Sequence, residues 1–227
     1  MHIHPAGLLY LLVVGLLVPY AAVRSAQRMA KLDRPLTRAV LARSAFLSFA
    51  FLGLISWGTA YAIGLPWADV RPLSARDALW AAGALALLLA WAPVGWRTHP
   101  ARDRERLAAI LPGTPAQAAL WVALSAGAGF FEEIAWRGVL FANAAWLLGS
   151  PWLAAALCAA SFGVAHAYQG SRNVAVTAAI ALVMHALVAL TGSLLAAMLV
   201  HFLYDLFVGF LFRELARREA AAARATA

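Results

Sequence analysis

Long stretches without a charged side chain recur along the whole chain, and they constrain its fold more than any other feature. Residues 107–131 and 138–165 contain no Asp, Glu, Lys or Arg, and further apolar stretches precede and follow them. A helix needs about 20 apolar residues to cross a bilayer, and backbone inside the bilayer must satisfy its own hydrogen bonds. The pattern therefore predicts an all-α, polytopic transmembrane helix bundle.

The composition excludes an ordinary soluble domain. Of the 227 residues, 64% are hydrophobic and only 12% are charged, and the mean hydropathy is +0.78. The formal net charge of +8 is compatible with nucleic-acid binding. However, the basic residues fall between the apolar stretches and do not form one face or arm. We therefore expect a lipid bilayer as the surroundings and no nucleic-acid partner.

Seven apolar stretches predict about seven transmembrane helices. They cover residues 6–23, 45–65, 78–96, 115–148, 151–168, 174–190 and 193–212. The fourth stretch is long for one perpendicular span. We expect its helix either to tilt and protrude into the cytoplasm or to break near Gly127 or Gly129.

The distribution of positive charge predicts the orientation of these helices, because cytoplasmic connections carry the excess of Lys and Arg. All but three of the 18 basic residues fall on one side of a seven-helix arrangement. They are Arg24, Arg28, Lys31, Arg34, Arg38, Arg43, Arg97, Arg102, Arg104, Arg106, Arg172, Arg213, Arg217, Arg218 and Arg224. Arg71 and Arg76 lie on the opposite side, and Arg137 lies within a span. The N-terminus is therefore expected outside and the C-terminus in the cytoplasm.

Three ionisable residues interrupt the apolar stretch of the fourth helix: Glu132, Glu133 and Arg137. A charged side chain at membrane depth costs about 2.5 to 3.5 kcal/mol on insertion scales, and such residues usually mark function. Residues four apart share a helix face, so Glu133 and Arg137 are predicted to form an ion pair. Glu132 would remain free for chemistry. The alternative is a structural ion pair that only fixes helix packing.

Two further pairs place imidazoles in later helices. Phe162-x-x-x-His166 ends the fifth apolar stretch, and His201-x-x-x-Asp205 lies deep in the seventh. Taken alone, His166 could be a packing or interfacial residue, and His201 could simply bond to Asp205. Glu132 and His166 lie at comparable distances from the turn at Ser150, so antiparallel helices bring them to similar depth.

Together these residues supply carboxylates, two imidazoles and a guanidinium from three helices. Such a set can activate water by general-base catalysis, while the imidazoles or a bound metal stabilise an oxyanion. Independent structural reasons for every member are less plausible than one shared site. The residues therefore predict a catalytic centre within the bundle.

The three motifs, in this order, resemble those of the CAAX-processing and bacteriocin-processing family of intramembrane proteases, also called the type II CAAX protease or Abi family. They read Glu132-Glu133-x-x-x-Arg137-Gly138, Phe162-x-x-x-His166 and His201-x-x-x-Asp205. Tyr168-Gln169-Gly170 and Thr191-Gly192-Ser193-Leu194 also look like family features. The resemblance covers roughly residues 115–212. It implies an intramembrane endopeptidase that cleaves a membrane-associated protein or peptide, and we expect it in a bacterial inner membrane.

The resemblance also divides the chain into three parts. Residues 1–114 would form three N-terminal transmembrane helices with basic cytoplasmic loops. Residues 115–212 would form a four-helix catalytic core, and residues 213–227 a basic, Ala-rich cytoplasmic tail.

By the same resemblance, Glu132 would activate the attacking water with help from His166, and His201 with Asp205 would line the oxyanion side. Glu133 and Arg137 would organise the site. The family often has Asn in place of Asp205. Since an ionised Asp cannot donate a hydrogen bond, Asp205 would be protonated, orient His201 or bind a metal.

The cofactor stays open at this stage. Zinc would accept Glu132, His166 and His201 and keep one position for water. A glutamate-based mechanism without metal fits the same residues equally well.

Two functions of other classes compete with proteolysis. A non-proteolytic membrane scaffold or bacteriocin-immunity protein would use the polar cluster for recognition. A proton- or ion-coupled transporter ranks last, because residues 138–150 offer only Asn143 and Ser150 toward the outer side. Packing roles are expected for Cys158, Ser161 and His185, which lie outside the motifs or lack the surroundings of a nucleophile.

Overall fold

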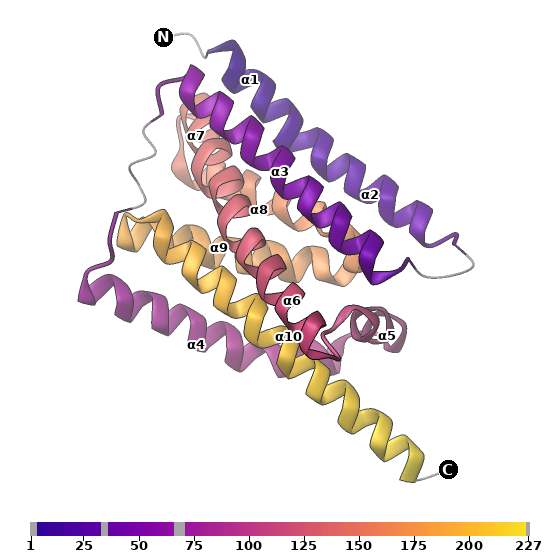
Figure 1. The fold of residues 1–227 in the computed structure, drawn as a ribbon. Coiled ribbons are helices and arrows are strands. Elements are labelled where there is room, and N and C mark those ends of the chain that lie inside the picture. Colours follow the sequence, from indigo (N-terminus) through magenta and orange to yellow (C-terminus); the bar gives the residue numbers. More distant parts are fainter. Residues whose placement is uncertain (1–3, 33–35, 66–70, 226–227) are drawn as a thin grey trace.

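The computed structural model describes residues 4–32, 36–65 and 71–225, and within these ranges the chain is helical and has no strand (Figure 1). Its elements are α1 (Pro5–Leu12), η1 (Val13–Leu17), α2 (Val18–Met29), α3 (Arg38–Ala62), α4 (Ala75–Thr98), α5 (Ala101–Ile110), α6 (Pro115–Gly127), η3 (Ala128–Glu132), η4 (Ile134–Leu140), α7 (Phe141–Leu148), α8 (Pro151–Ala165), η5 (Ala167–Gln169), α9 (Ser171–Thr191) and α10 (Leu194–Ala225).

Six continuous helical segments in the described part are long and apolar enough to cross a membrane, and one shorter apolar helix accompanies them. The six are Pro5–Met29, Arg38–Ala62, Ala75–Thr98, Pro115–Leu148, Ser171–Thr191 and Leu194–Ala225, and the shorter one is Pro151–Ala165. The prediction of a polytopic all-α bundle is confirmed. Helix α8 ends three residues earlier than predicted, because His166 leaves the helical conformation (φ −96°, ψ 13°).

Local sequence signals explain where the central helices begin and end. The hydroxyl of Thr114 accepts from the N–H of Gln117, and Pro115 follows it at the first helical position. Ser150 and Pro151 begin α8 in the same way. The preceding helix ends at Gly149, whose φ of 62° is favourable only for glycine.

The long fourth helix breaks at neither Gly127 nor Gly129. It continues from Pro115 to Leu148, but its middle is π-helical in the two segments η3 and η4. Such i→i+5 turns are rare and occur frequently at functional sites. They contain Glu132 and Arg137 and lie on either side of Glu133, so the charged motif sits on an irregular backbone.

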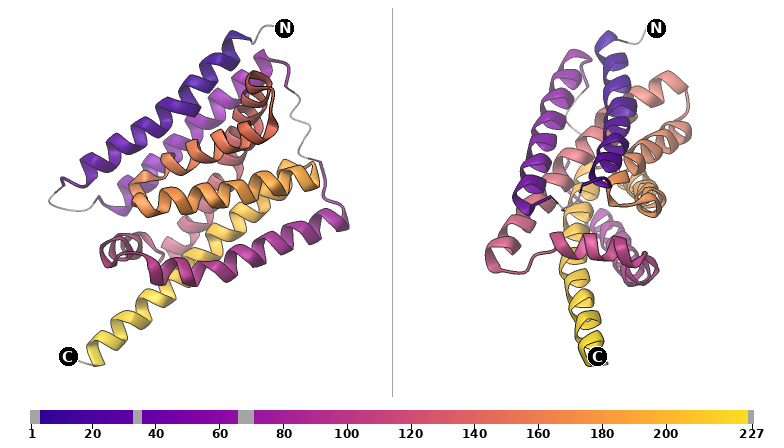
Figure 2. Two further views of the ribbon diagram at one scale, coloured as in Figure 1. Left: turned by 180° about the vertical axis from the view of Figure 1, so that it is seen from behind. Right: turned by 90° about the vertical axis from the view of Figure 1, so that its right-hand side faces the viewer.

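The N-terminal helices pack against this irregular segment. The hydroxyl of Tyr10 lies 2.6 Å from Ser56 Oγ and donates to the backbone oxygen of Ala135 at 3.3 Å. It thereby ties α1 and α3 to η4. These helices form one side of the molecule, and α4, α9 and α10 lie on the other (Figures 1 and 2).

The two ends of the chain lie at opposite ends of the bundle, and the last part of α10 projects beyond the other helices (Figures 1 and 2). Hydropathy predicts the end of the span at residue 212, but the helix runs on to Ala225. Glu214 accepts from Arg218 one turn later at 2.8 Å, and the alanines that follow favour helix. Arg34, counted among the basic residues of the first connection, lies outside the described residues.

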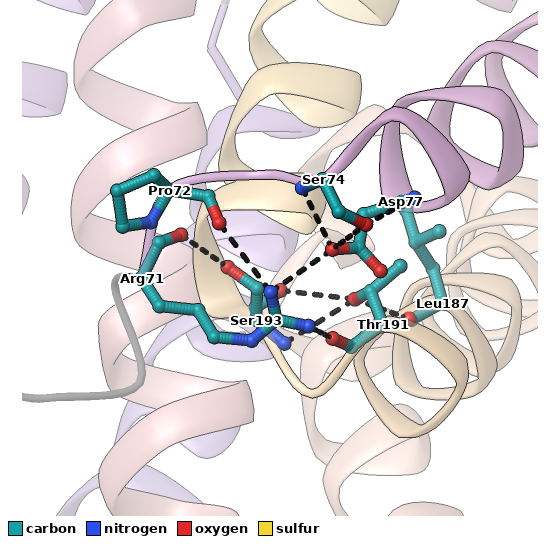
Figure 3. Close-up of polar contacts among 7 residues, drawn as sticks. All are labelled: Arg71, Pro72, Ser74, Asp77, Leu187, Thr191 and Ser193. Atoms are coloured by element: carbon teal, nitrogen blue, oxygen red, sulfur yellow. Dashed lines mark hydrogen bonds and ion pairs between the residues drawn. The ribbon is translucent and has the colours of Figure 1, made fainter.

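A polar clamp fastens the beginning of α10 (Figure 3). The guanidinium of Arg71 pairs with Asp77 at 3.0 Å and donates to the backbone oxygen of Thr191. In return, the hydroxyl of Ser193 donates to the backbone oxygen of Arg71 at 3.0 Å. Gly192, between Thr191 and Ser193, turns the chain with a φ of 59°. The start of α4 thus holds the turn that leads into α10.

Candidate active site

The carboxylate of Glu133 is the centre of the polar cluster and is completely buried. Its Oε1 atom accepts a hydrogen bond from Nδ1 of His201 at 2.7 Å and lies 3.1 Å from Nη1 of Arg137. Residue 133 separates the two π-helical segments, and its predicted partner four residues later is in contact with it. The first and third motifs therefore meet at one carboxylate.

The guanidinium of Arg137 is also buried, and one of its faces is covered by an aromatic ring. Its Cζ atom lies 4.4 Å from the centre of the ring of Phe162. A cation over a ring face is attracted by the ring quadrupole, most strongly where water is excluded. Arg137 thus compensates the negative charge of Glu133, and its guanidinium packs on the ring of Phe162 from the second motif.

Glu132 points toward His166 instead of toward Arg137. The Oε2 atom of Glu132 lies 3.8 Å from Nε2 of His166. Nδ1–H of His166 donates to the backbone oxygen of Phe162 at 2.8 Å, which leaves the lone pair of Nε2 on the Glu132 side. A separation of 3.8 Å is too long for a direct hydrogen bond and suits two groups that contact the same water.

His201 lies between two carboxylates. Its Nδ1 is bound to Glu133, and its Nε2 lies 3.5 Å from Oδ2 of Asp205 one turn later. The backbone oxygen of Asp205 accepts from the indole of Trp121 at 3.1 Å, which fixes this turn of α10 against α6. The carboxyl of Asp205 thus faces the free edge of the imidazole.

Exposure rises from the centre of the cluster toward one side. The side chain of Glu133 is 0% exposed and that of His201 10%, but the side chains of Glu132, His166 and Asp205 are 15%, 17% and 33% exposed. The second group therefore forms the accessible side of the site. A substrate would meet Glu132, His166 and Asp205 first.

Gly129 allows α10 to approach this cluster closely. A Cβ atom at this position would lie 2.8 Å from the backbone nitrogen of Phe202 and 2.9 Å from the backbone oxygen of Met198. These atoms belong to the helical turn that carries His201. A glycine one turn before Glu133 thus brings the two helices together at the site.

Phe162 is a residue whose importance sequence reasoning missed, although it begins the second motif. Besides Arg137, its ring contacts His166 with centroids 4.5 Å apart and His201 at 6.1 Å. Its backbone oxygen also fixes His166. An aromatic residue in an apolar stretch is expected to pack in the core. The only signal in the sequence for a further role of Phe162 is its position one helical turn before His166.

Buried polar atoms without a hydrogen-bond partner are concentrated here. In the described part of the chain they are Glu132 Oε2, Glu133 Oε2, the three guanidinium nitrogens of Arg137 and His185 Nε2. Native interiors rarely leave such groups unsatisfied, and exceptions accompany functional sites or internal water. Arg137 and Glu133 lie close enough to form an ion pair but are not hydrogen-bonded to each other, so both groups retain unused hydrogen-bonding capacity.

The arrangement does not match the three-ligand zinc site that Glu132, His166 and His201 could form. Among the described residues, no group of three His, Cys, Asp or Glu side chains is disposed to hold a metal. The two imidazoles face different acids, since His166 Nε2 is directed at Glu132 and His201 Nε2 at Asp205.

The residues assigned to packing lie outside the cluster. Ser161 accepts from the indole of Trp136 at 3.1 Å and donates to the backbone oxygen of Val14 at 3.2 Å. The ring of His185 packs on that of Phe141 with centroids 5.3 Å apart, and Cys158 is fully buried. Ser161 is thus occupied by structural hydrogen bonds.

Comparison with known proteins bears on the same helices. Residues 114–207 match the family model described as type II CAAX prenyl endopeptidase Rce1-like. The match contains all three motifs and confirms the resemblance drawn from them. No curated protein and no solved structure matched the chain.

Proposed function

We propose, from the family to which residues 114–207 are matched, that this integral membrane protein is an endopeptidase that hydrolyses a peptide bond of a membrane-associated protein or peptide. The observation that carries the proposal is the pair of Glu132 and His166 at 3.8 Å, on the accessible side of a buried charged cluster. This pair can hold a water molecule between an acceptor carboxylate and an imidazole lone pair.

In the proposed reaction, Glu132 removes a proton from that water as the water oxygen bonds to the carbonyl carbon of the substrate. The electrons of the carbonyl double bond move to its oxygen and give an oxyanion. When this species collapses, the C–N bond breaks and the proton held by Glu132 passes to the leaving nitrogen. His166 orients the water through its Nε2, because its Nδ1–H is engaged by the backbone.

His201 would stabilise the oxyanion. Its Nδ1–H donates to Glu133 and fixes the ring, and the carboxyl of Asp205 faces its Nε2. Two flanking carboxylates favour the imidazolium, which carries a proton on Nε2 as well. An N–H aimed at the developing negative charge stabilises the transition state more than the ground state. Asp205, 3.5 Å from Nε2, would orient the ring and receive its hydrogen bond in the absence of substrate.

Glu133 and Arg137 would organise the site without touching the substrate. Both are fully buried, and each contacts a side chain of another motif: Glu133 contacts His201, and Arg137 contacts Phe162. A buried charge pair of this kind fixes the relative positions of helices, because a shift that separates its members leaves an uncompensated charge.

The basic connections support an orientation with the N-terminus outside and the C-terminus in the cytoplasm of a bacterial inner membrane. Arg172 donates to the backbone oxygen of Thr98, so two of these connections meet beside the end of α8. His166 is at that end. The proposed substrate would therefore reach the site from the cytoplasmic half of the bilayer. Residues 115–212 would form the catalytic core, and residues 1–114 would support it.

Comparative proteomics of protein termini tests this function. Membranes from cells with the wild-type protein are compared with membranes from cells with Glu132→Ala, at equal levels of both proteins. At least one new terminus is expected only with the wild type. Identical sets of termini would overturn the proposal and favour a binding role as scaffold or immunity protein, which does not need Glu132 as a base.

A further inference from the structure

Tyr168 stands at the accessible side of the site, in the short turn η5 that follows His166. Its ring stacks on the imidazole of His166, with centroids 6.2 Å apart and planes inclined by 29°. The residue is 43% exposed. It is held there because α8 ends at Ala165 and Gly170, with φ 116°, redirects the chain into α9. Tyr168 thus extends the aromatic surface of the site beyond His166.

The hydroxyl group of Tyr168 is oriented by its neighbour. Nε2 of Gln169 donates a hydrogen bond to the phenolic oxygen at 3.0 Å. A phenol carries one proton, so an oxygen that accepts from Gln169 keeps that proton available for another acceptor. The ring of Tyr168 stacks on His166, whose Nε2 faces Glu132, so the phenol belongs to the same polar cluster.

The oxyanion needs a donor that the three motifs do not fully supply. Nδ1 of His201 is bound to Glu133, and Nε2 faces Asp205. An ionised carboxylate accepts hydrogen bonds and donates none. Asp205 therefore competes with the oxyanion for the one N–H that His201 can offer. A second donor that is protonated at neutral pH would compensate for this competition.

We propose that Tyr168 is a further catalytic residue, whose hydroxyl donates a hydrogen bond to the oxyanion formed at the scissile carbonyl. This inference rests on the proposed endopeptidase function. Gln169 is then a positioning residue, which holds the phenolic oxygen through its side-chain amide. The Tyr168-Gln169 pair adds to the site a donor that does not depend on the protonation state of Asp205.

The test is the variant Tyr168→Phe, assayed in liposomes with a substrate identified by its terminus in wild-type membranes. It keeps the ring that stacks on His166 and removes only the hydroxyl. Loss of one oxyanion donor is expected to lower kcat by about 10²- to 10³-fold and to leave KM nearly unchanged. Gln169→Met should lower kcat by about 2- to 12-fold, the effect of one ordinary hydrogen bond.

Tyr204→Phe is the matched control, because Tyr204 lies on α10 beside Asp205 and packs on the apolar cluster of α4, α9 and α10. It should keep wild-type kcat. A wild-type kcat for Tyr168→Phe, or a raised KM with unchanged kcat, would overturn the inference and leave the endopeptidase function intact. If Glu132→Ala cleaves as well as the wild type, the proposed function itself fails, whatever Tyr168→Phe does.

Discussion

Nδ1 of His201 lies 2.7 Å from Oε1 of Glu133, although the two residues are 68 positions apart in the chain. This contact joins the first and third motifs inside the bundle. It gives the imidazole a fixed orientation and gives Glu133 a second partner besides Arg137. The geometry of the proposed oxyanion site thus depends on a carboxylate that no substrate is expected to touch.

Removal of the negative charge of Glu133 should destabilise the protein strongly. Glu133→Gln leaves Arg137 as a buried, unpaired cation, and breaking a buried pair in this way costs about 3 to 5 kcal/mol. The change is measured as a loss of thermal stability in detergent. Glu133→Gln combined with Arg137→Met should recover much of the stability but no activity, because His201 still lacks a negatively charged partner at its Nδ1.

Glu214→Gln is the control for this experiment. It also removes a carboxylate that pairs with arginines on the same helix face, but this pair is exposed to solvent. Water screens an exposed pair, so the stability should barely change. Equal losses in Glu133→Gln and Glu214→Gln would contradict the assigned role of Glu133.

Gly129→Ala should separate the helices that form the site. The added methyl group would meet backbone atoms of Met198 and Phe202, which cannot yield as the tip of a flexible side chain can. Overpacking of this kind costs about 1 to 3 kcal/mol, and here it moves α10 away from Glu133. Activity should fall by at least about tenfold, because small displacements of catalytic groups have large effects on rate.

Gly83→Ala provides the comparison, since nothing lies within 4 Å of a Cβ atom at that position of α4. It should retain activity and gain slightly in stability, as alanine is the better helix former by about 1 kcal/mol. A fully active Gly129→Ala would mean that the close approach of α10 is not needed for the reaction.

Phe162→Leu should lower activity without abolishing it. The variant keeps the backbone oxygen that fixes His166 but loses the ring that covers Arg137. The lost cation–π contact is worth up to about 2 kcal/mol where water is excluded, which corresponds to roughly a thirtyfold decrease in kcat if all of it acts on catalytic geometry. Phe51→Leu, on the exposed face of α3, should have no effect on kcat.

Arg71→Ala should loosen the turn between α9 and α10. The side chain is 45% exposed, so the ion pair with Asp77 contributes little, but the hydrogen bond to the backbone of Thr191 is also lost. We expect about 1 kcal/mol of destabilisation and faster hydrogen exchange at residues 192–196. Arg76→Ala, at an exposed position in the first turn of α4, should leave the exchange unchanged. Equal exchange in both variants would argue against the clamp.

The fold and the three ionisable pairs of the site follow from simple patterns in the sequence. Apolar stretches identify membrane-spanning helices, and an i, i+4 spacing brings Glu133 to Arg137 and His201 to Asp205. Comparable distances from a tight turn bring Glu132 to His166. Each of these relationships depends on residues one helical turn apart or on two helices joined by a tight turn.

Contacts between helices that no tight turn connects could not be predicted in this way. The bond from His201 to Glu133 depends on the backbone approach at Gly129, and helical periodicity does not identify the neighbour of a given glycine. The π-helical segments depend on i→i+5 hydrogen bonds, which hydropathy does not encode. Hydropathy also did not predict the helix Ala101–Ile110 or the extension of α10, because both segments are rich in charged residues. The lack of an apolar stretch shows that a segment does not span the membrane, but it does not show that the segment is not helical.

The most direct measurement is the rate of peptide hydrolysis by Glu132→Gln, reconstituted in liposomes beside the wild type with the substrate found by terminus proteomics. Glutamine preserves the size of the side chain but cannot accept a proton from water. Loss of the general base predicts a decrease in kcat of about 10²- to 10⁴-fold, with unchanged thermal stability. Hydrolysis at the wild-type rate by the same amount of Glu132→Gln would contradict the proposed mechanism.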